Sequence, residues 1–71
     1  MIEQHEIHNS QSVRWIAFNP ETGTIMVRFK TGATYAYEGT RAIWEDFVKA
    51  DSKGGFIHHG LKGLPYKKIA D

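Results

Sequence analysis

The residue types in this chain that could do chemistry on a partner are cations and aromatic rings. Lysine and arginine bind phosphate groups, and tyrosine or histidine rings stack on nucleic-acid bases. The candidates, most of them near the C-terminus, are Arg28, Lys30, Lys53, His58, Lys62, Tyr66, Lys67 and Lys68. Together they predict a surface that binds RNA or another single-stranded nucleic acid.

The charges of the chain are unevenly distributed. The formal net charge of the 71 residues is +1, which by itself implies no partner. Residues 1–51 hold five Lys/Arg against seven Asp/Glu, a balance of −2, whereas residues 52–71 hold four lysines against one aspartate, a balance of +3. The asymmetry favours an anionic partner for the C-terminal part. The alternative is a solvated lysine surface without a partner.

The sequence offers little for catalysis or for metal binding. There is no cysteine, and Ser52 lacks the flanking glycines of a nucleophile elbow. Four histidines occur as two close pairs, His5 with His8 and His58 with His59. Structural zinc sites usually include cysteine, and the imidazoles of adjacent residues point in different directions. We therefore expect a non-catalytic domain without a metal or another cofactor.

A protein-interaction module is the competing interpretation. A domain of this size, with an acidic body and a basic C-terminal part, suits an accessory or inhibitory partner of a larger enzyme. An exposed Trp15 or Trp44 would be its anchor, because tryptophan is enriched among the residues that dominate binding energy. The sequence leaves nucleic acid and protein open as partners and indicates no oligomeric state.

The N-terminal residues 1–6 include acidic side chains and no apolar run, so they are unlike a secretory signal. No stretch approaches the roughly 20 apolar residues of a membrane span. The absence of cysteine fits a reducing compartment. From the sequence we expect a soluble, cytoplasmic protein without a membrane partner.

Two short strands are expected to precede the first tyrosines. Residues 12–18 are rich in β-branched and aromatic types, and a bulge near Arg14-Trp15 is needed to reconcile their alternation. The run Asn19-Pro20-Glu21-Thr22-Gly23 predicts a turn with Gly23 at positive φ. Residues 24–29 then alternate cleanly. One face of this second strand holds Ile25, Val27 and Phe29.

The turn Lys30-Thr31-Gly32 decides where the next two tyrosines point. A two-residue loop would force β-branched Thr31 to positive φ, which is strained. A three-residue loop with Gly32 in the left-handed region avoids this strain. The resulting register places Tyr35 and Tyr37 opposite apolar residues of the preceding strand. Both rings should therefore belong to the core and not to an exposed stacking platform.

A helix and a returning tail should follow the strands. Residues 41–50 have an apolar stripe at helical spacing, with Thr40 as a plausible N-cap. The pair Gly54-Gly55 is expected to end the helix in a left-handed cap. Residues 56–69 are too apolar for a free tail, so we expect them to wrap back over the domain, with a short helical turn or strand near residues 57–61.

The fold class predicted is α+β, with a three-stranded antiparallel β-meander, one helix packed on one face and a C-terminal segment wrapping back. Residues 1–9 are expected to be a loose N-terminal arm, and residues 10–71 a single domain. A short chain without disulfides needs a dense aromatic core. The predicted core is Val13, Ile16, Phe18, Ile25, Val27, Phe29, Tyr35, Tyr37, Ile43, Trp44, Phe47, Phe56 and Leu61.

An ordered set of short motifs spans residues 10–69. The motifs are Ser10-x-Ser12-Val13, Ile16-Ala17-Phe18-Asn19, Val27-x-Phe29-x-x-Gly32-x-x-Tyr35-x-Tyr37, Ala50-Asp51-Ser52-Lys53-Gly54 with Phe56, Leu61-Lys62 and Pro65-Tyr66. In this order they resemble the KTSC domain, which is named for a C-terminal domain of some lysyl-tRNA synthetases and also occurs as a stand-alone bacterial protein. The resemblance implies a small α+β domain and a lean toward RNA.

The chain also departs from the pattern of that family. Phe18 stands where the family commonly has tyrosine, and His58 stands where asparagine is expected. A proline that is usual near the helix start is missing. Any specific contact that the asparagine makes in the family is therefore not carried over to this chain.

Overall fold

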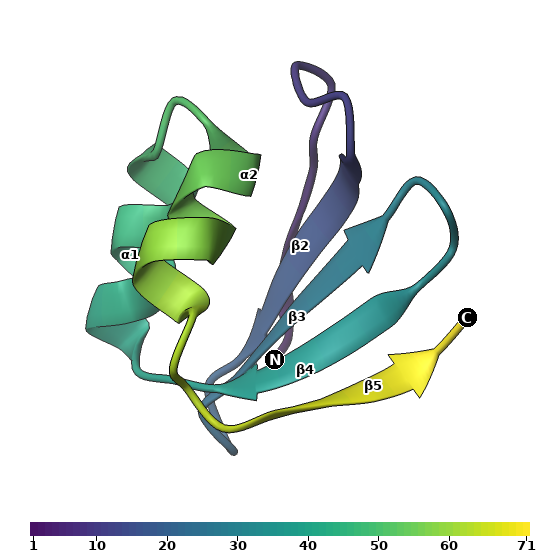
Figure 1. The fold of residues 1–71 in the computed structure, drawn as a ribbon. Coiled ribbons are helices and arrows are strands. Elements are labelled where there is room, and N and C mark those ends of the chain that lie inside the picture. The colour runs from purple at the N-terminus through teal and green to yellow at the C-terminus, as the bar shows by residue number, and fades with distance from the viewer.

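The computed structural model describes residues 1–71 and contains one antiparallel sheet with a helical layer on one face (Figure 1). The strands are β1 (Glu3–Glu6), β2 (Val13–Asn19), β3 (Thr24–Phe29), β4 (Thr34–Glu38) and β5 (Tyr66–Ala70). The helical segments are α1 (Arg41–Lys49), α2 (Lys53–Phe56) and the π-helical turn η1 (Ile57–Leu61). None of them combines the length and the apolar character needed to span a membrane.

The sheet has five strands in the order β1-β2-β3-β4-β5, two more than the sequence predicted. The expected loose arm at residues 1–9 is wrong in part, because Glu3–Glu6 pairs with β2 as an edge strand. The C-terminal segment does return to the domain, and it does so by pairing with β4 as the opposite edge strand. The α+β class is confirmed, with a larger sheet.

The strand registers follow the turn chemistry. Gly32 has φ 101°, and the Phe29 amide donates to the Ala33 carbonyl at 2.9 Å, as a three-residue loop requires. Tyr35 consequently lies opposite Val27, and Tyr37 opposite Ile25. The predicted β-bulge is also present, since the pairing of β2 with β3 shifts between Val13 and Trp15.

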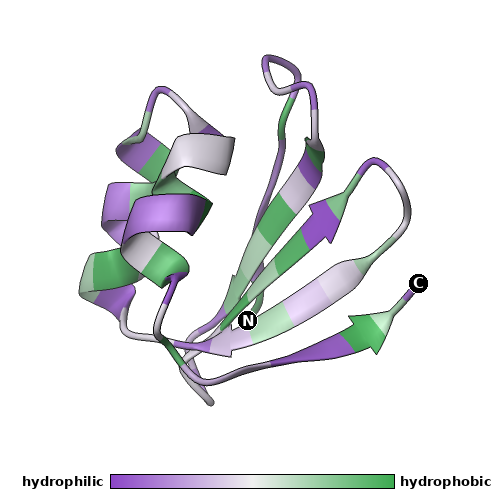
Figure 2. Cartoon of the chain, in the orientation of Figure 1, coloured by the Kyte–Doolittle hydropathy of each residue, from purple (hydrophilic) through white to green (hydrophobic).

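The core lies between the helical layer and the inner faces of β2, β3 and β4. Figure 2 shows hydrophobic bands alternating along β2 and β3. The buried cluster is Val13, Ile16, Phe18, Ile25, Val27, Tyr37, Trp44, Phe47 and Leu61. The other predicted core residues are only partly buried and pack against this cluster; they are Phe29, Tyr35, Ile43 and Phe56.

The helical layer differs from the expected single helix. Thr40 caps α1 as predicted, accepting from the Ile43 amide at 3.3 Å. The expected left-handed cap at Gly54-Gly55 is wrong, because neither glycine has positive φ. Both lie inside α2, where the Ser52 hydroxyl accepts from the Gly55 amide at 3.0 Å. A new N-cap therefore restarts the helix, and α2 continues into η1.

A carboxylate on β1 ties the first strand to α1. The Arg41 guanidinium donates to both oxygens of Glu3, at 2.6 and 3.3 Å. The indole Nε1 of Trp44 donates to the same carboxylate at 3.2 Å. The hydrogen bond from Arg41, with a smaller one from Trp44, lowers the pKa of Glu3. This junction explains why a short polar segment forms an ordered edge strand.

Two glycine substitutions should have opposite effects on stability. At Gly23, φ is 72° and a Cβ would lie 2.9 Å from the Gly39 carbonyl oxygen, so Gly23→Ala should lower the free energy of unfolding by about 1–3 kcal/mol. At Gly54 a Cβ would meet only the Ser12 hydroxyl at 3.7 Å. Gly54→Ala should raise the free energy of unfolding by up to about 1 kcal/mol through helix propensity. Urea denaturation measures both values, and a destabilised Gly54→Ala would contradict the helical assignment.

The Glu3 junction should make stability depend on pH in acid. A carboxyl group whose pKa is lower in the folded state stabilises the fold above its unfolded pKa. That stabilisation is lost as pH falls from the ordinary value of 4.5 through the lowered folded value. Glu3→Gln should therefore lower the melting temperature at neutral pH. As the pH falls below about 5, the melting temperature of the variant should decline less than that of the natural chain, because the variant has no carboxyl group at this position to protonate. Equal acid sensitivity of the variant and the natural chain would contradict this role.

Candidate nucleic-acid interface

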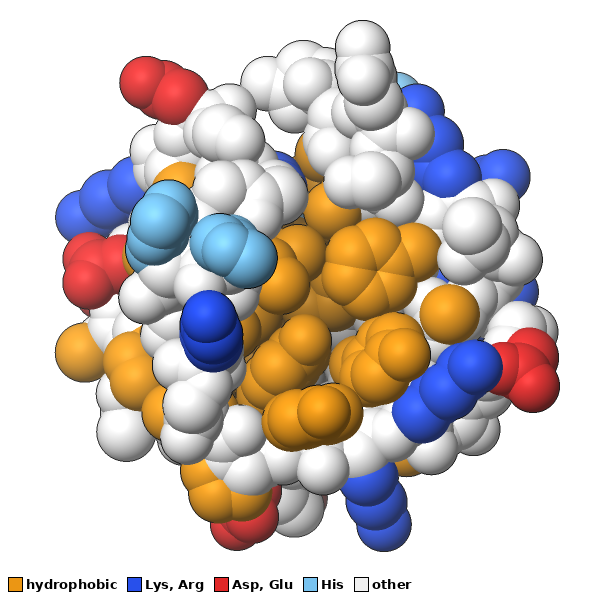
Figure 3. All heavy atoms as spheres, viewed as in Figure 1, with side chains coloured by type: hydrophobic (Ala, Val, Ile, Leu, Met, Phe, Trp, Pro, Cys, Tyr) orange, Lys and Arg blue, Asp and Glu red, His pale blue; other side chains and the backbone are white.

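The helical layer leaves part of the inner sheet face uncovered. Residues of β2 and β3 lie buried beneath the helices, whereas all five residues of β5 are exposed. The two layers diverge toward β4 and β5 (Figure 1). Figure 3 shows a field of hydrophobic side chains in the opening, bordered by histidine side chains and by lysine or arginine side chains. An open apolar surface therefore continues outward from the core.

A row of aromatic rings forms the floor of this opening. The ring centroids of Phe29 and Tyr35 are 5.9 Å apart, those of Tyr35 and Tyr66 are 6.0 Å apart, and those of Tyr66 and Tyr37 are 5.7 Å apart. Tyr66 is 64% exposed, and Tyr37 is nearly buried. We call the surface formed by Phe29, Tyr35, Tyr37 and Tyr66 the aromatic groove. Burial raises the pKa of Tyr37, and its two tyrosine neighbours add to the effect, so its hydroxyl stays protonated at neutral pH.

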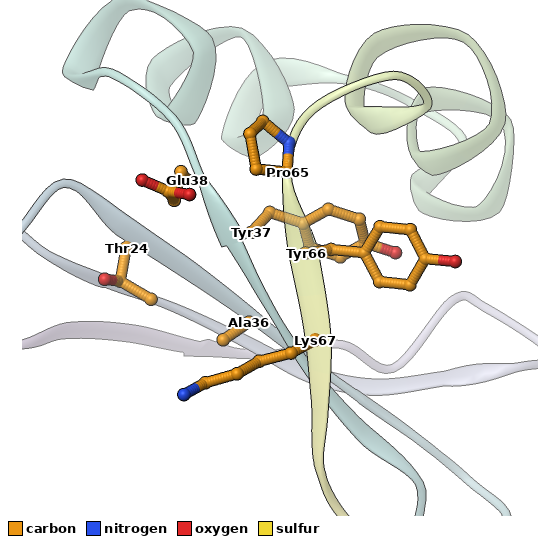
Figure 4. A pocket seen from close by; sticks show the side chains of 7 residues that line it. All are labelled: Thr24, Ala36, Tyr37, Glu38, Pro65, Tyr66 and Lys67. Atoms are coloured by element: carbon orange, nitrogen blue, oxygen red, sulfur yellow. The ribbon is translucent and has the colours of Figure 1, made fainter.

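The pleat of β4 and β5 separates the groove from the outer face of the sheet. Tyr37 lies opposite Tyr66, and Ala36 opposite Lys67. In Figure 4 the rings of Tyr37 and Tyr66 project together to one side, while Lys67 projects to the other side together with Thr24. Successive residues of β5 therefore serve different faces.

Four of the eight predicted site residues border or line the groove. Tyr66 is in its floor, and His58 and Lys62, which are exposed, lie at η1 and just after it. Lys68 lies opposite Tyr35 and forms an ion pair with Asp71. Lys62 forms no ion pair. The groove thus has cationic groups near both of its sides.

Three predicted site residues lie elsewhere. Arg28 and Lys67 are on the outer face, where Arg28 donates to the Thr34 hydroxyl at 3.3 Å. Lys30 is exposed at the turn between β3 and β4. The outer face remains open, because β5 extends the sheet and does not cross it. The cations predicted from the sequence therefore do not all lie on one surface.

Lys53 was assigned to the phosphate-binding surface, and this prediction is wrong. Its side chain is buried, and its ammonium group donates to the carbonyls of Val48 at 3.0 Å and Ala50 at 2.5 Å. These carbonyls close the C-terminal turn of α1, where a cation satisfies orphan acceptors and the helix dipole. Lys53 is a capping residue that phosphate cannot reach.

Motif residues from opposite parts of the chain meet in a polar corner beside Lys53. The Ser10 hydroxyl accepts from the amides of Ser12 and Val13, at 3.3 and 3.1 Å. The Ser12 hydroxyl faces Gly54 at the start of α2. The Ser10 hydroxyl thus caps the turn before β2, and Ser12 places this turn next to the start of α2. No cluster of three or more His, Asp or Glu side chains is arranged to hold a metal ion.

Tyr35 and Phe29 were predicted to lie in a closed core, and this prediction is wrong in part. Both rings are only partly buried and continue the groove. The available signal was Tyr66, a third tyrosine in the strand-like run Tyr66-Lys67-Lys68-Ile69. A strand there would have extended the sheet beyond the width that one helix covers.

The fold is that of a small α+β domain, in which one helical layer covers part of a five-stranded antiparallel sheet. The KTSC domain model matches residues 9–66, so the chain belongs to the KTSC domain family. A crystal structure of the KTSC domain protein YPO2434 from Yersinia pestis is similar, with a TM-score of 0.86 and 25% sequence identity, over 97% of this chain and 99% of that one. No curated protein matches the chain.

The capping role of Lys53 predicts a loss of stability without a loss of ligand affinity. Lys53→Ala should lower the free energy of unfolding by about 1–3 kcal/mol, since two hydrogen bonds from a charged donor disappear. Lys49→Ala, at an exposed position of α1, the helix that Lys53 caps, is the matched control and should change stability by less than about 0.5 kcal/mol. Chemical denaturation gives both values. A selective loss of nucleic-acid affinity in folded Lys53→Ala would contradict the capping role.

Proposed function

We propose that this domain is a non-catalytic module that binds RNA or another single-stranded nucleic acid in the aromatic groove. The observation that carries the proposal is the Tyr66 ring, 64% exposed and in one row with Tyr35 and Tyr37. Exposed rings next to cations are the usual means of binding single strands, because every base has a π-face and every nucleotide a phosphate. The absence of cysteine suits a reducing compartment, and we propose the cytoplasm.

The cations near the groove support the same proposal. Lys62 and His58 lie on the side of the helical layer, and Lys68 lies on the side of β5. A strand lying in the groove would pass between these groups, so its phosphates can contact either side. Lys67 and Arg28, on the outer face, add to the positive potential that attracts an anionic ligand without touching a strand in the groove.

A protein-interaction module is the second candidate. The specific observation in its favour is β5, an edge strand whose five residues are all exposed. Such an edge accepts an extended segment of another protein through main-chain hydrogen bonds. Trp44 does not serve as the anchor for a partner, because it is only 2% exposed. Trp15 is partly exposed on the outer face and remains available.

The salt dependence of RNA binding tests the proposed function. The affinity for a single-stranded oligoribonucleotide should fall as salt rises, because bound phosphates release counterions. Lys62→Ala combined with Lys68→Ala should reduce the slope of log affinity against log salt by about 1.4, two phosphate contacts at about 0.7 each. Fluorescence anisotropy at several salt concentrations measures the slope.

A matched double variant serves as the control for this test. Lys30→Ala combined with Lys49→Ala removes the same charge from positions outside the groove, and its slope should stay close to that of the natural chain. If the slope fell equally in both double variants, or if the affinity did not depend on salt, phosphate contacts in the groove would be contradicted. A tagged protein that binds no RNA but retains a protein after nuclease treatment would favour the second candidate.

A further inference from the structure

Four hollows mark the surface, and only one of them has a lysine and no carboxylate in its lining. The other three include Glu38, Asp51 and Glu6, respectively. The fourth lies between η1 and the beginning of β5, at one end of the aromatic groove, and has a volume of about 280 Å³. His58 and Lys62 belong to its lining. Because a nearby carboxylate repels an anion, this hollow is the one suited to an anionic ligand.

The walls of this hollow are flat and apolar. Tyr37 and Tyr66 stand on one side, their ring centroids 5.7 Å apart and their planes inclined by 35°. Ile57 and Leu61 contribute from η1. The volume of the hollow lies just below the range of about 300–1,000 Å³ that is usual for ligand pockets, so it has room for no more than a small group such as one planar ring system. The lining thus combines stacking surfaces with an exposed histidine and lysine.

We propose that this hollow holds a single unpaired nucleotide, with its base against Tyr66 and its phosphate near Lys62. The inference rests on the proposed function and narrows it to bases that are not in a duplex. In a duplex the faces of each base are covered by its neighbours, and exposing one costs unstacking energy. A base can stack on the Tyr66 ring in the wall of the hollow only if one of its own faces is exposed.

The continuation of the groove favours a nucleotide within a strand over a free one. From Tyr66 the row of rings runs on to Tyr35 and then to Phe29. A base that follows the one in the hollow would therefore meet another ring, with Lys68 opposite Tyr35 for the next phosphate. A free mononucleotide and an unpaired base of a strand share the same chemistry in the hollow itself.

The test compares three probes: a labelled oligoadenylate, the same strand annealed to its complement, and adenosine monophosphate alone. Anisotropy reports on the first two, and amide chemical shifts report on the third. Tyr66→Ala should weaken binding of the single strand by about 5- to 150-fold, the effect of losing one stacked base. Tyr66→Phe keeps the ring and should bind like the natural chain. The duplex should bind more weakly than the single strand.

A second pair of variants keeps the test decisive if Tyr66→Ala loosens β5. His58→Asp puts a carboxylate into the lining of the hollow, and His59→Asp puts the same charge on the next residue, which does not line it. The first should weaken binding several-fold more than the second. Both residues are exposed, so neither change disturbs the core.

The outcomes separate the two proposals. If no probe binds, both the proposed function and this inference fail. Suppose that the single strand binds, but that the Tyr66→Ala and His58→Asp variants bind it as tightly as the natural chain does, or that the duplex binds as tightly as the single strand. In either case only the proposal for the hollow is overturned. Binding of the mononucleotide as tight as that of the strand supports the hollow and identifies a free nucleotide as its ligand.

Discussion

The three-residue turn at Lys30-Thr31-Gly32 is the constraint on which the aromatic groove depends. It sets the pairing of β4 with β3, and this pairing puts Tyr35 and Tyr37 on the face that the helices cover. A slip of one residue would move every side chain of β4 to the opposite face. Tyr66 follows, because its position on β5 is set by pairing with β4. One glycine at positive φ therefore fixes the faces of three tyrosines that lie up to 34 residues farther along the chain.

The groove results from a mismatch between the two layers. One helical layer covers part of a sheet that β5 widens, so rings that a second helix would bury remain accessible. The covered part is densely packed. Trp44 stacks on Phe18 with a ring-centroid distance of 5.6 Å, and Phe47 stacks on Phe56 with a ring-centroid distance of 5.1 Å. The uncovered part contains the same kind of residue, but there the Tyr66 ring is 64% exposed and contributes less buried area to stability. Aromatic residues thus serve both the core and the surface.

Local chemistry predicted much of the fold and less of the site. The turn glycines Gly23 and Gly32, the bulge in β2 and the Thr40 cap all depend on a few neighbouring residues, and all were confirmed. The edge strand β1 was missed because its residues are polar, and β5 was missed because its two lysines interrupt the apolar alternation that begins at Tyr66. Gly54-Gly55 was misassigned since the Ser52 cap and tertiary packing override weak helix propensity. The position of the Lys53 ammonium group depends on carbonyls that only the folded helix presents. The residue type alone therefore suggested an exposed phosphate-binding lysine and not a buried helix cap.

The strand order has a consequence for the way the molecule folds and opens. Every neighbouring pair from β1 to β4 is a hairpin closed over a short loop, so these contacts are local and form quickly. The pairing of β4 with β5 must instead wait for the intervening helical segment, Arg41 to Leu61, to close a long loop. β5 should therefore join last and detach first, as the element with the least protected amides. The outer wall of the aromatic groove would then be a mobile flap, and the groove can open without unfolding of the core.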